Sequence, residues 1–255
     1  IEIDNCVFDG NRESAYLDGN GGDARIEACT FESLAESGYY IAAWSQASLS
    51  IQECTFSLSD DIYGQTCFSI MGVENASIIS CEISEGTVGA TVSFGGQTTF
   101  RGCTFDGQLN VALSASVASS VSVNSCTFRN QACAVTSSSS DNLFIMSNTL
   151  IENVTVCSFL VQRFGAVSVN NCDLAKGDRG VVWVSEEGSC PSIEHLDFTN
   201  NYWDTDRPDS IQAWIRDRND TENACYIIDW EPYSDVPLPS KKKSFGGLKA
   251  MFRGR

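Results

Sequence analysis

The sequence contains two pairs of neighbouring acidic residues, a residue type that binds cations and takes part in acid–base catalysis. Asp60 and Asp61 form one pair, and Glu186 and Glu187 form the other. Carboxylate oxygens bind calcium, and two carboxylates together can supply the acid and the base that break a glycosidic bond. Both pairs stand in polar stretches between apolar segments, where acidic side chains are usually solvated. We therefore expect no catalytic residue and no cofactor here, and we retain all four as candidates for a ligand or for calcium.

Two tryptophans offer a second kind of chemistry, because an indole ring has a broad apolar face on which a sugar ring can stack. Trp44 and Trp183 lie in apolar segments that contain Ser or Val but no charged residue. Facing outward, they would contact a ligand. Facing inward, they would fill the core, and this is the orientation we favour. The single histidine, His195, has no evident serine or cysteine partner, so we interpret it as structural.

Most of the twelve cysteines belong to a repeated phrase. The phrase is an apolar residue, two variable residues, a cysteine, one further residue and another apolar residue, as at residues 3–8 and 26–31. Nine copies follow one another at intervals of 22 to 27 residues. The cysteine slot contains, in chain order, Cys6, Cys29, Cys54, Cys81, Cys103, Cys126, Asn148, Cys172 and Leu196.

A repeat of this length predicts the fold. Each unit is rich in Val, Ile, Phe, Thr and Ser and breaks at Gly, Asn or Asp, which indicates short strands joined by turns. A unit this small cannot bury an apolar face alone, so it must stack on its neighbours. We predict a parallel β-solenoid of about nine coils with about three strands in each coil. The slot then forms an internal ladder, in which cysteine takes the place of the stacked asparagines known from such folds.

The remaining cysteines are expected to pack rather than to bind metal. Cys67, Cys133 and Cys157 lie in apolar strand segments and are predicted to be small buried hydrophobic residues. The chain has no closely paired cysteines of the kind that bind zinc. Cys190 and Cys225 alone are placed to form a disulfide, and the sequence leaves that pairing open.

With these repeats, the chain resembles the right-handed parallel β-helix repeat proteins, the superfamily that includes the pectate lyases. The resemblance covers residues 3 to about 239. Its most specific part is Phe-Thr-Asn-Asn-Tyr-Trp at residues 198–203, which is similar to the Asn-Tyr-Trp-Gly closing phrase of many bacterial members, although Asp204 stands where glycine is usual. The resemblance implies an all-β, right-handed, single-stranded parallel β-helix and a secreted protein. It implies little about activity, because this architecture hosts many functions.

The end of the solenoid needs a cover, since its last coil would otherwise expose core and strand edges. Asp206 as N-cap, Pro208 in the first turn and Ile211, Trp214 and Ile215 on one face predict a short capping helix. We divide the chain into coils at residues 1–203, a cap at 204–239 and a basic tail at 240–255. The tail is predicted to dock to a surface or a partner, or back onto the acidic body.

Charge excludes some classes of partner. Residues 1–240 hold all 33 acidic residues and ten Lys or Arg, a balance of −23, while the last 15 residues hold six cations and no acid. An acidic body repels phosphates, so we expect no nucleic-acid binding by the coils. No apolar run approaches the length of a transmembrane helix. The chain begins at Ile1 inside a repeat, which suggests a portion of a longer protein.

The composition of the strands that follow the ladder turns favours one of two functions. None of these strands contains Asp, Glu, His, Lys or Arg, and Lys176 stands alone among the coils. The His-Gly and Asp-Pro-His phrases of enzymes in the resembled superfamily are also absent. We therefore predict a non-catalytic, secreted or surface-displayed solenoid that binds carbohydrate or serves as an adhesin or spacer. The alternative is a polysaccharide-active lyase or glycosidase whose acids come from the turns.

Overall fold

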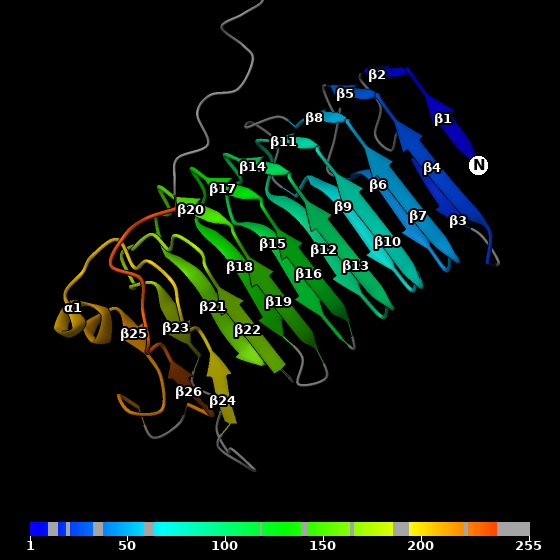
Figure 1. The fold of residues 1–255 in the computed structure, drawn as a ribbon. Helices are drawn as coiled ribbons and strands as arrows, with labels where there is room; N and C mark the ends of the chain where they lie inside the picture. Colours follow the sequence, from blue (N-terminus) through cyan, green and yellow to red (C-terminus); the bar gives the residue numbers. More distant parts are fainter. Residues whose placement is uncertain are drawn as a thin grey trace, which may run out of the picture.

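The computed structural model describes residues 1–9, 15–18, 21–32, 38–58, 64–117, 119–138, 142–163, 166–185, 194–221 and 224–238. Three parallel sheets wrap a continuous apolar core, and the chain winds from the N-terminal end of a rod toward a small cap (Figure 1). Neighbouring strands of a sheet pair in parallel, and successive coils stay in register apart from one shift between Ser137 and Ser138. The fold class predicted from the repeat is confirmed.

The three sheets differ in the number of strands that they contain. Sheet A has ten strands: β1 (Glu2–Asp4), β4 (Asp23–Glu27), β7 (Ser48–Gln52), β10 (Asn75–Ile79), β13 (Gln97–Arg101), β16 (Ser120–Asn124), β19 (Leu143–Ser147), β22 (Ala166–Asn170), β24 (Glu194–Asp197) and β26 (Tyr226–Asp229). Sheet B has seven: β2 (Val7–Asp9), β5 (Thr30–Glu32), β8 (Thr55–Ser57), β11 (Glu82–Ser84), β14 (Thr104–Asp106), β17 (Thr127–Arg129) and β20 (Leu150–Glu152).

Sheet C has nine strands: β3 (Ala15–Asp18), β6 (Tyr39–Trp44), β9 (Thr66–Met71), β12 (Val88–Ser93), β15 (Val111–Ser116), β18 (Cys133–Ser138), β21 (Cys157–Arg163), β23 (Val182–Val184) and β25 (Ile215–Arg216). Seven coils therefore carry a strand in all three sheets, fewer than the nine that the repeat predicted. In the two coils that follow, sheet B is reduced to single bridges at Asp173 and Tyr202.

Stacked aromatic rings fill the core beneath sheet B. The rings of Phe8, Phe31 and Phe56 stack at centroid distances of 4.6 Å, nearly parallel to one another. Phe105 and Phe128 repeat the arrangement at 4.9 Å. These are the apolar residues that end the repeated phrase, and the in-register pairing of the strands places each ring on the ring of the next coil. Buried aromatic pairs of this kind stabilise the stack beyond the area they remove from water.

The register corrects two members of the cysteine ladder. Val123 pairs with Met146, so the residue level with Cys126 is Thr149 and not Asn148. In the last coil Ser168 pairs with Asp197, so the residue level with Cys172 is Asn201 and not Leu196. The sequence placed the phrase one residue and five residues too early in these two coils. Leu196 is a buried core residue of β24.

Hydrogen bonds along the rod axis confirm the corrected ladder. The backbone N–H of a slot residue donates to the slot side chain of the next coil, as from Cys29 to Cys54 Sγ at 3.4 Å and from Cys172 to Asn201 Oδ1 at 2.9 Å. Each slot side chain also donates to the carbonyl two residues before it, as Thr149 Oγ1 does to Ser147 at 2.9 Å. Asn201 instead donates to Val169 and Phe198 carbonyls. A thiol, a hydroxyl and an amide thus accept equivalent hydrogen bonds from the preceding coil.

The residue before every slot has a left-handed backbone. Its φ lies between 51° and 65° in all nine coils, at Asn5, Ala28, Glu53, Ser80, Gly102, Ser125, Asn148, Asn171 and Asn200. Asparagine and glycine tolerate this conformation, which explains why five of these nine positions carry one of them. Asn148 therefore belongs to the turn position, and the preference of that position for asparagine caused the error in the predicted ladder. Asp204 has the same conformation, with φ 57°, which accounts for the glycine usual there.

The cap covers the last coil as predicted, with a different start. Helix α1 (Pro208–Ala213) has Pro208 at its first position, but its N-cap is Arg207 rather than Asp206 and makes no side-chain capping bond. Ile211 and Trp203 are buried in the core, and Trp214 and Trp230 are half-buried against it. No helix in the described ranges has the length and hydropathy needed to cross a membrane.

The corrected ladder makes a first prediction. Asn201→Ala removes three hydrogen bonds from a fully buried side chain and should lower the free energy of unfolding by about 3 kcal/mol. Asn148→Gly keeps a residue that suits the left-handed turn and should change it by less than about 1 kcal/mol. Urea denaturation of both variants measures the difference. Equal losses of unfolding free energy in the two variants would show that Asn148 belongs to the ladder.

A second prediction concerns the left-handed turn itself. Glu53 lacks the glycine or asparagine that φ 52° favours, so Glu53→Gly should raise the free energy of unfolding by about 0.5 to 1 kcal/mol. The matched change Glu82→Gly falls in extended strand β11 and should lower it by a similar amount. Thermal denaturation of the two variants should therefore show shifts of opposite sign. A lower melting temperature for Glu53→Gly would contradict this.

Candidate functional site

The outer face of sheet C carries one column of residues from end to end of the rod. Strand pairing aligns Tyr16 with Ala42, and the column then continues along the rod axis. Its middle is made of small and hydroxyl side chains, and its far end is aromatic and basic. In chain order the column contains Tyr16, Ala42, Ser69, Thr91, Ser114, Thr136, Leu160, Trp183 and Arg216.

Both candidate tryptophans face outward on this sheet, so the inward orientation that we favoured from sequence is wrong. Trp44 is 40% exposed, and its ring lies 6.1 Å from that of Tyr16, which is 52% exposed. Trp183 is half-buried between the core residues Val182 and Val184, whose side chains take the inward positions of β23. The alternation of a strand leaves the outward position to Trp183.

Large apolar side chains continue from Trp44 along one edge of sheet C. Phe94 follows β12 and Val117 follows β15, and these side chains are 60% and 40% exposed. Both residues have left-handed backbones, with φ 50° and 40°. The aligned residues of the two preceding coils, Ser45 and Gly72, have the same left-handed backbone, so this conformation belongs to a turn that recurs after sheet C, and only the large side chains are particular to Phe94 and Val117. We call Trp44, Phe94 and Val117 the apolar edge, and Tyr16 lies beside Trp44 in the column.

A small apolar cluster, separate from the main core, lies at the other end of sheet C. Val111, Cys133 and Cys157 are buried there, with Leu160 and Trp183 packed against them. The sulfur atoms of Cys133 and Cys157 are 3.3 Å apart, and this contact raises the pKa of Cys157 and lowers that of Cys133. The predicted burial of the non-ladder cysteines is confirmed for Cys67 as well.

The structure does not describe the four candidate acidic residues or one of the two cysteines expected to pair. Asp60, Asp61, Glu186, Glu187 and Cys190 lie outside the described residues. Cys225 is disulfide-bonded, whereas the other ten described cysteines are free thiols. The pairing of Cys225 with Cys190 stays a prediction. Among the described residues, no group of three or more His, Cys, Asp or Glu side chains is arranged to hold a metal ion.

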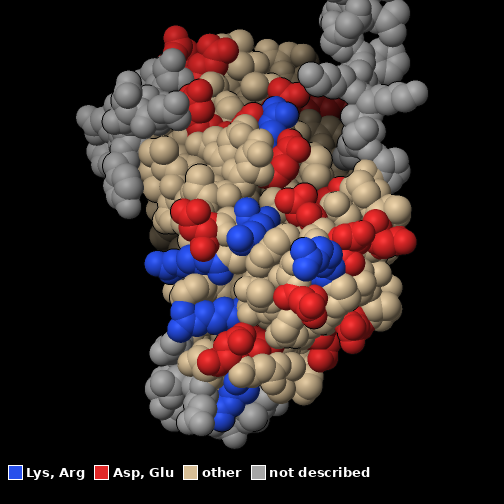
Figure 2. Space-filling model, turned by 90° about the vertical axis from the view of Figure 1, so that its left-hand side faces the viewer, with Lys and Arg blue, Asp and Glu red and all other residues tan. Residues whose placement is uncertain are grey.

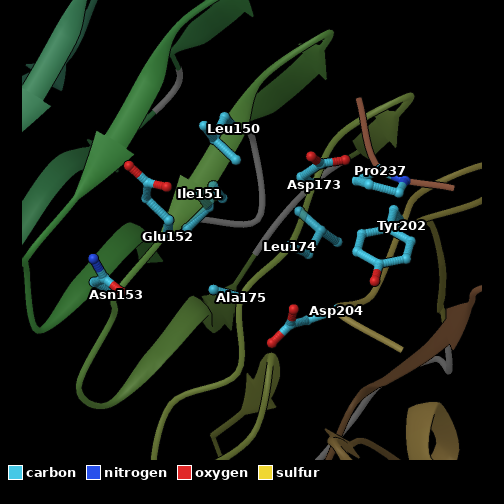
Figure 3. Close-up of a pocket in the computed structure, with 10 residues that line it drawn as sticks. All are labelled: Leu150, Ile151, Glu152, Asn153, Asp173, Leu174, Ala175, Tyr202, Asp204 and Pro237. Atoms are coloured by element: carbon cyan, nitrogen blue, oxygen red, sulfur yellow. The ribbon is translucent and has the colours of Figure 1, made fainter. Parts of the chain in front are cut away.

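A different set of carboxylates lines a pocket of about 350 Å³ on the outer face of the last sheet B coils (Figure 3). Glu152 lies at the end of β20, Asp173 and Tyr202 lie on the bridges that continue sheet B, and Asp204 and Pro237 complete the wall. Asp173 is 9% exposed and accepts a hydrogen bond of 2.8 Å from the Leu238 N–H. The segment that leads out of the cap is thereby fixed to the side of the rod.

Asp173 titrates abnormally in this position. Burial raises the pKa of its carboxyl group above the ordinary value, the hydrogen bond from Leu238 opposes the shift, and the charge of Asp204 adds to it. The folded protein therefore holds this proton more tightly than the unfolded chain does. Ionised Asp173 costs stability at neutral pH. The cost decreases as the pH falls below the folded pKa and is gone below the unfolded pKa.

Acidic residues also gather at the end of sheet A. Asp197 and Asp229 are paired residues of neighbouring strands, and His195 Nδ1 lies 3.0 Å from an Asp229 oxygen. Burial would raise the pKa of Asp197, but hydrogen bonds from Thr199, Asn170 and Ser168 outweigh it and lower that pKa. Asp197 and Thr199 line a pocket of about 500 Å³ with Trp230. This pocket and the pocket of Asp173 lie on different sheets and share no lining residue.

The comparison with protein families agrees with this architecture. Residues 58–174 match the family model described as a right-handed beta helix region. The protein is a right-handed parallel β-helix. No curated protein and no solved structure matches the chain. The family match covers the central coils and supports the fold of the β-helix, while the closing phrase at residues 198–203 gains its explanation from the ladder bonds of Asn201 and the burial of Trp203.

Sequence reasoning missed one group of side chains on the β-helix. Lys176 looked like a lone cation among the coils, yet Lys176, Arg179 and Arg216 all approach the indole rings of Trp183 or Trp214. Arg216 comes from the cap, far along the chain from Lys176 and Arg179. The Lys-Gly-Asp-Arg-Gly sequence at residues 176–180 was the available signal, since two glycines this close indicate a tight turn.

The raised pKa of Asp173 gives a prediction for the β-helix. Asp173→Asn keeps an acceptor for the Leu238 N–H and removes the buried charge, so its melting temperature at pH 7 should exceed that of the parent protein. The advantage should shrink as the pH falls toward 4, because Asp173 of the parent protein then becomes protonated. Scanning calorimetry from pH 4 to pH 8 measures both trends.

Asp204→Asn is the companion variant, because it removes the neighbouring charge and suits the left-handed backbone. It should give a smaller gain in the same direction. Glu82→Gln, at an exposed position of strand β11, serves as the control for loss of one charge. A lower melting temperature for Asp173→Asn at pH 7 would mean that the ionised carboxylate holds the 232–238 segment more strongly than its burial costs.

Proposed function

We propose that this β-helix is a non-catalytic glycan-binding protein, displayed outside the cell, whose ligand lies along the outer face of sheet C. The observation that carries the proposal is the outward-facing pair of Tyr16 and Trp44, of which Tyr16 begins the column that continues through Ala42 into hydroxyl side chains. Exposed aromatic rings supply apolar platforms at little cost in side-chain entropy, and hydroxyl groups donate and accept hydrogen bonds as sugar hydroxyls do.

The shape of the face suits a chain-like ligand. Thr91, Ser114 and Thr136 are half-buried and succeed one another at the strand spacing, so their hydroxyls form a straight and rigid row. The apolar edge runs beside this row, with Phe94 and Val117 next to the ends of β12 and β15. Exposed apolar residues that recur along one edge indicate a binding surface more strongly than scattered ones do.

Charge favours a neutral glycan over a polyanion. Strands β6, β9, β12, β15 and β18 contain no charged residue, and the protein as a whole has a formal net charge of −17. A polyuronate would meet repulsion from the body and few counter-charges on this face. The same lack of acids and bases on these strands leaves no group for proton transfer there, which supports binding without cleavage.

The proposed location outside the cell rests on two observations. The disulfide of Cys225 suits an oxidising compartment, and the β-helix resembles secreted proteins in its repeat. The free thiols of the ladder are compatible with that compartment, because they are buried from Cys29 onward. Burial raises the pKa of Cys172 to about 12, so its thiol stays protonated.

Affinity electrophoresis against neutral polysaccharides, pectin and alginate tests the proposal. We expect retardation by at least one neutral polysaccharide and a change in tryptophan fluorescence on binding. Trp44→Ala should weaken this binding roughly tenfold, since it removes an aromatic ring on which a sugar ring stacks. Ile145→Ala, an exposed apolar residue on the outer face of sheet A, is the matched control and should leave binding unchanged.

The same incubations distinguish binding from catalysis. New reducing ends or unsaturated products would replace the binding proposal with the polysaccharide-active alternative. Equal losses for Trp44→Ala and Ile145→Ala would remove sheet C as the binding face, and the absence of binding to every polysaccharide would overturn the function.

A further inference from the structure

We propose that Cys133 and Cys157 are a redox-active dithiol, which a small disulfide compound such as oxidised glutathione converts into a covalent bond between two neighbouring coils. The two cysteines are the first residues of β18 and β21, which pair side by side in sheet C. The proposal is independent of glycan binding. It rests on the distance between the two sulfur atoms, on their place outside the main core and on their hydrogen bonding.

The two sulfur atoms already lie in contact. Cys133 Sγ and Cys157 Sγ are 3.3 Å apart, and the Cys157 N–H donates to the Ala132 carbonyl at 3.3 Å, which keeps the two residues level. Paired strands lie roughly 4.8 Å apart, and this falls within the range of about 4.4 to 6.8 Å that the Cα atoms of a disulfide span. Side-chain rotation can therefore bring the sulfur atoms to the bonding distance of about 2.05 Å with little movement of the coils.

Cys133 faces the outer side of sheet C. The two residues that follow it, Ala134 and Val135, both belong to the main core. Cys133 does not belong to that core and packs instead in the separate small cluster. Oxidation of this thiol therefore leaves the stacked side chains of the main core in place.

The side chains that cover the pair are only partly buried. Leu160 and Trp183 pack against the two cysteines and are half-exposed to solvent on their other side. Cys133 is 5% exposed, whereas Cys157 is fully buried. A compound in solution therefore reaches Cys133 first, by displacing outer side chains rather than core.

The ladder thiols are held differently. Cys54 donates to the Gln52 carbonyl at 3.1 Å, and Cys172 donates to the Asn170 carbonyl at 3.3 Å. Among the described residues, the hydrogen bond of the Cys133 and Cys157 thiols is the one between their own sulfur atoms. A disulfide in the ladder would cost bonds to the backbone, but a disulfide between Cys133 and Cys157 replaces only their mutual contact.

The surroundings select Cys133 as the thiol that attacks first. The contact with Cys157 lowers the pKa of Cys133 against the effect of burial, and the charge of Arg179 adds to the lowering. The same contact, together with burial, raises the pKa of Cys157. Arg179 is exposed in the last coils of the rod, and Figure 2 shows that basic side chains lie among acidic ones at that end. A thiolate is the nucleophile in disulfide exchange.

The exchange takes two steps. The Cys133 thiolate attacks one sulfur of the small disulfide RSSR, which forms the mixed disulfide Cys133–S–S–R and releases one thiolate RS⁻. Cys157 then loses its proton and attacks the Cys133 sulfur, which forms the bond between the coils and releases the second RS⁻. Two protein thiols are oxidised, one RSSR is reduced to two RSH, and the two protons pass from the cysteines to the released thiolates.

Peptide mapping tests the proposal, because trypsin cleavage after Arg129 and Arg163 gives a peptide, 130–163, that contains these two cysteines and no other. The folded chain is equilibrated in glutathione buffers of rising oxidised fraction, quenched with acid, denatured and alkylated. We expect peptide 130–163 to become lighter by two hydrogen atoms and to resist alkylation. Peptide 26–101 is the control, since its cysteines are buried in the main core, and it should keep every thiol free.

Two single variants assign the roles. Cys157→Ser should trap glutathione on Cys133 as a stable mixed disulfide, because the thiol that resolves it is gone. Cys133→Ser should collect less glutathione, because Cys157 is fully buried. Equal amounts of adduct on the two variants would overturn the assignment of Cys133 as the attacking thiol.

The parent protein decides the proposal even where a variant fails to fold. Oxidation of peptide 130–163 should raise the melting temperature, because the new bond restricts the unfolded chain. The dithiol is overturned if peptide 130–163 stays reduced in the folded protein until peptide 26–101 also loses thiols.

Discussion

The hydrogen bond that joins each turn to the slot side chain of the next coil is the interaction on which the rest of this structure depends. It ties a backbone N–H to a thiol, hydroxyl or amide one strand spacing away, as between Cys29 and Cys54 or between Cys172 and Asn201. Because the bond recurs along the axis, it holds successive coils in register. A slip of one residue would send the core side chains of a strand to the outer face. The row of hydroxyls on sheet C therefore depends on a turn between the other two sheets.

Function in such a repeat lies where coils depart from the common pattern. The middle coils present Thr91, Ser114 and Thr136, which differ little from one another and offer a uniform surface. The distinctive side chains lie at the two ends: an aromatic pair near the N-terminal end and a basic cluster beside the cap. Phe94 and Val117 mark a third departure in residue type, because the left-handed turn that they share with Ser45 and Gly72 carries a small residue in those two coils.

The fold could be predicted from the sequence, because the same phrase recurs many times and each copy indicates the same alignment of the coils. The prediction failed where that phrase was weak. At Asn148 the turn residue was mistaken for the ladder residue, since asparagine suits both positions, and at Leu196 a core leucine occupied the expected place. The orientation of Trp44 depended on which strand positions face inward, and sheet C turns two consecutive residues, Tyr40 and Ile41, into the core. The cluster of Arg179 and Arg216 joins a coil to the cap, a contact that no local pattern contains.

The cysteines of the ladder matter both for the packing of the coils and for the chemistry of the protein. In a chain that also carries a disulfide at Cys225, a ladder of accessible thiols would be open to exchange, unless the thiols were out of reach. From Cys29 to Cys172 the ladder thiols are buried, and each donates to a carbonyl two residues before it, as Cys54 does to Gln52. Along the stack the contact with Cys103 raises the pKa of Cys81, and the contact with Cys126 lowers that of Cys103. The thiols thus bond to the backbone and to one another and face no solvent. Their place in the coils is structural, and the chemistry of this protein has to be sought on its outer face.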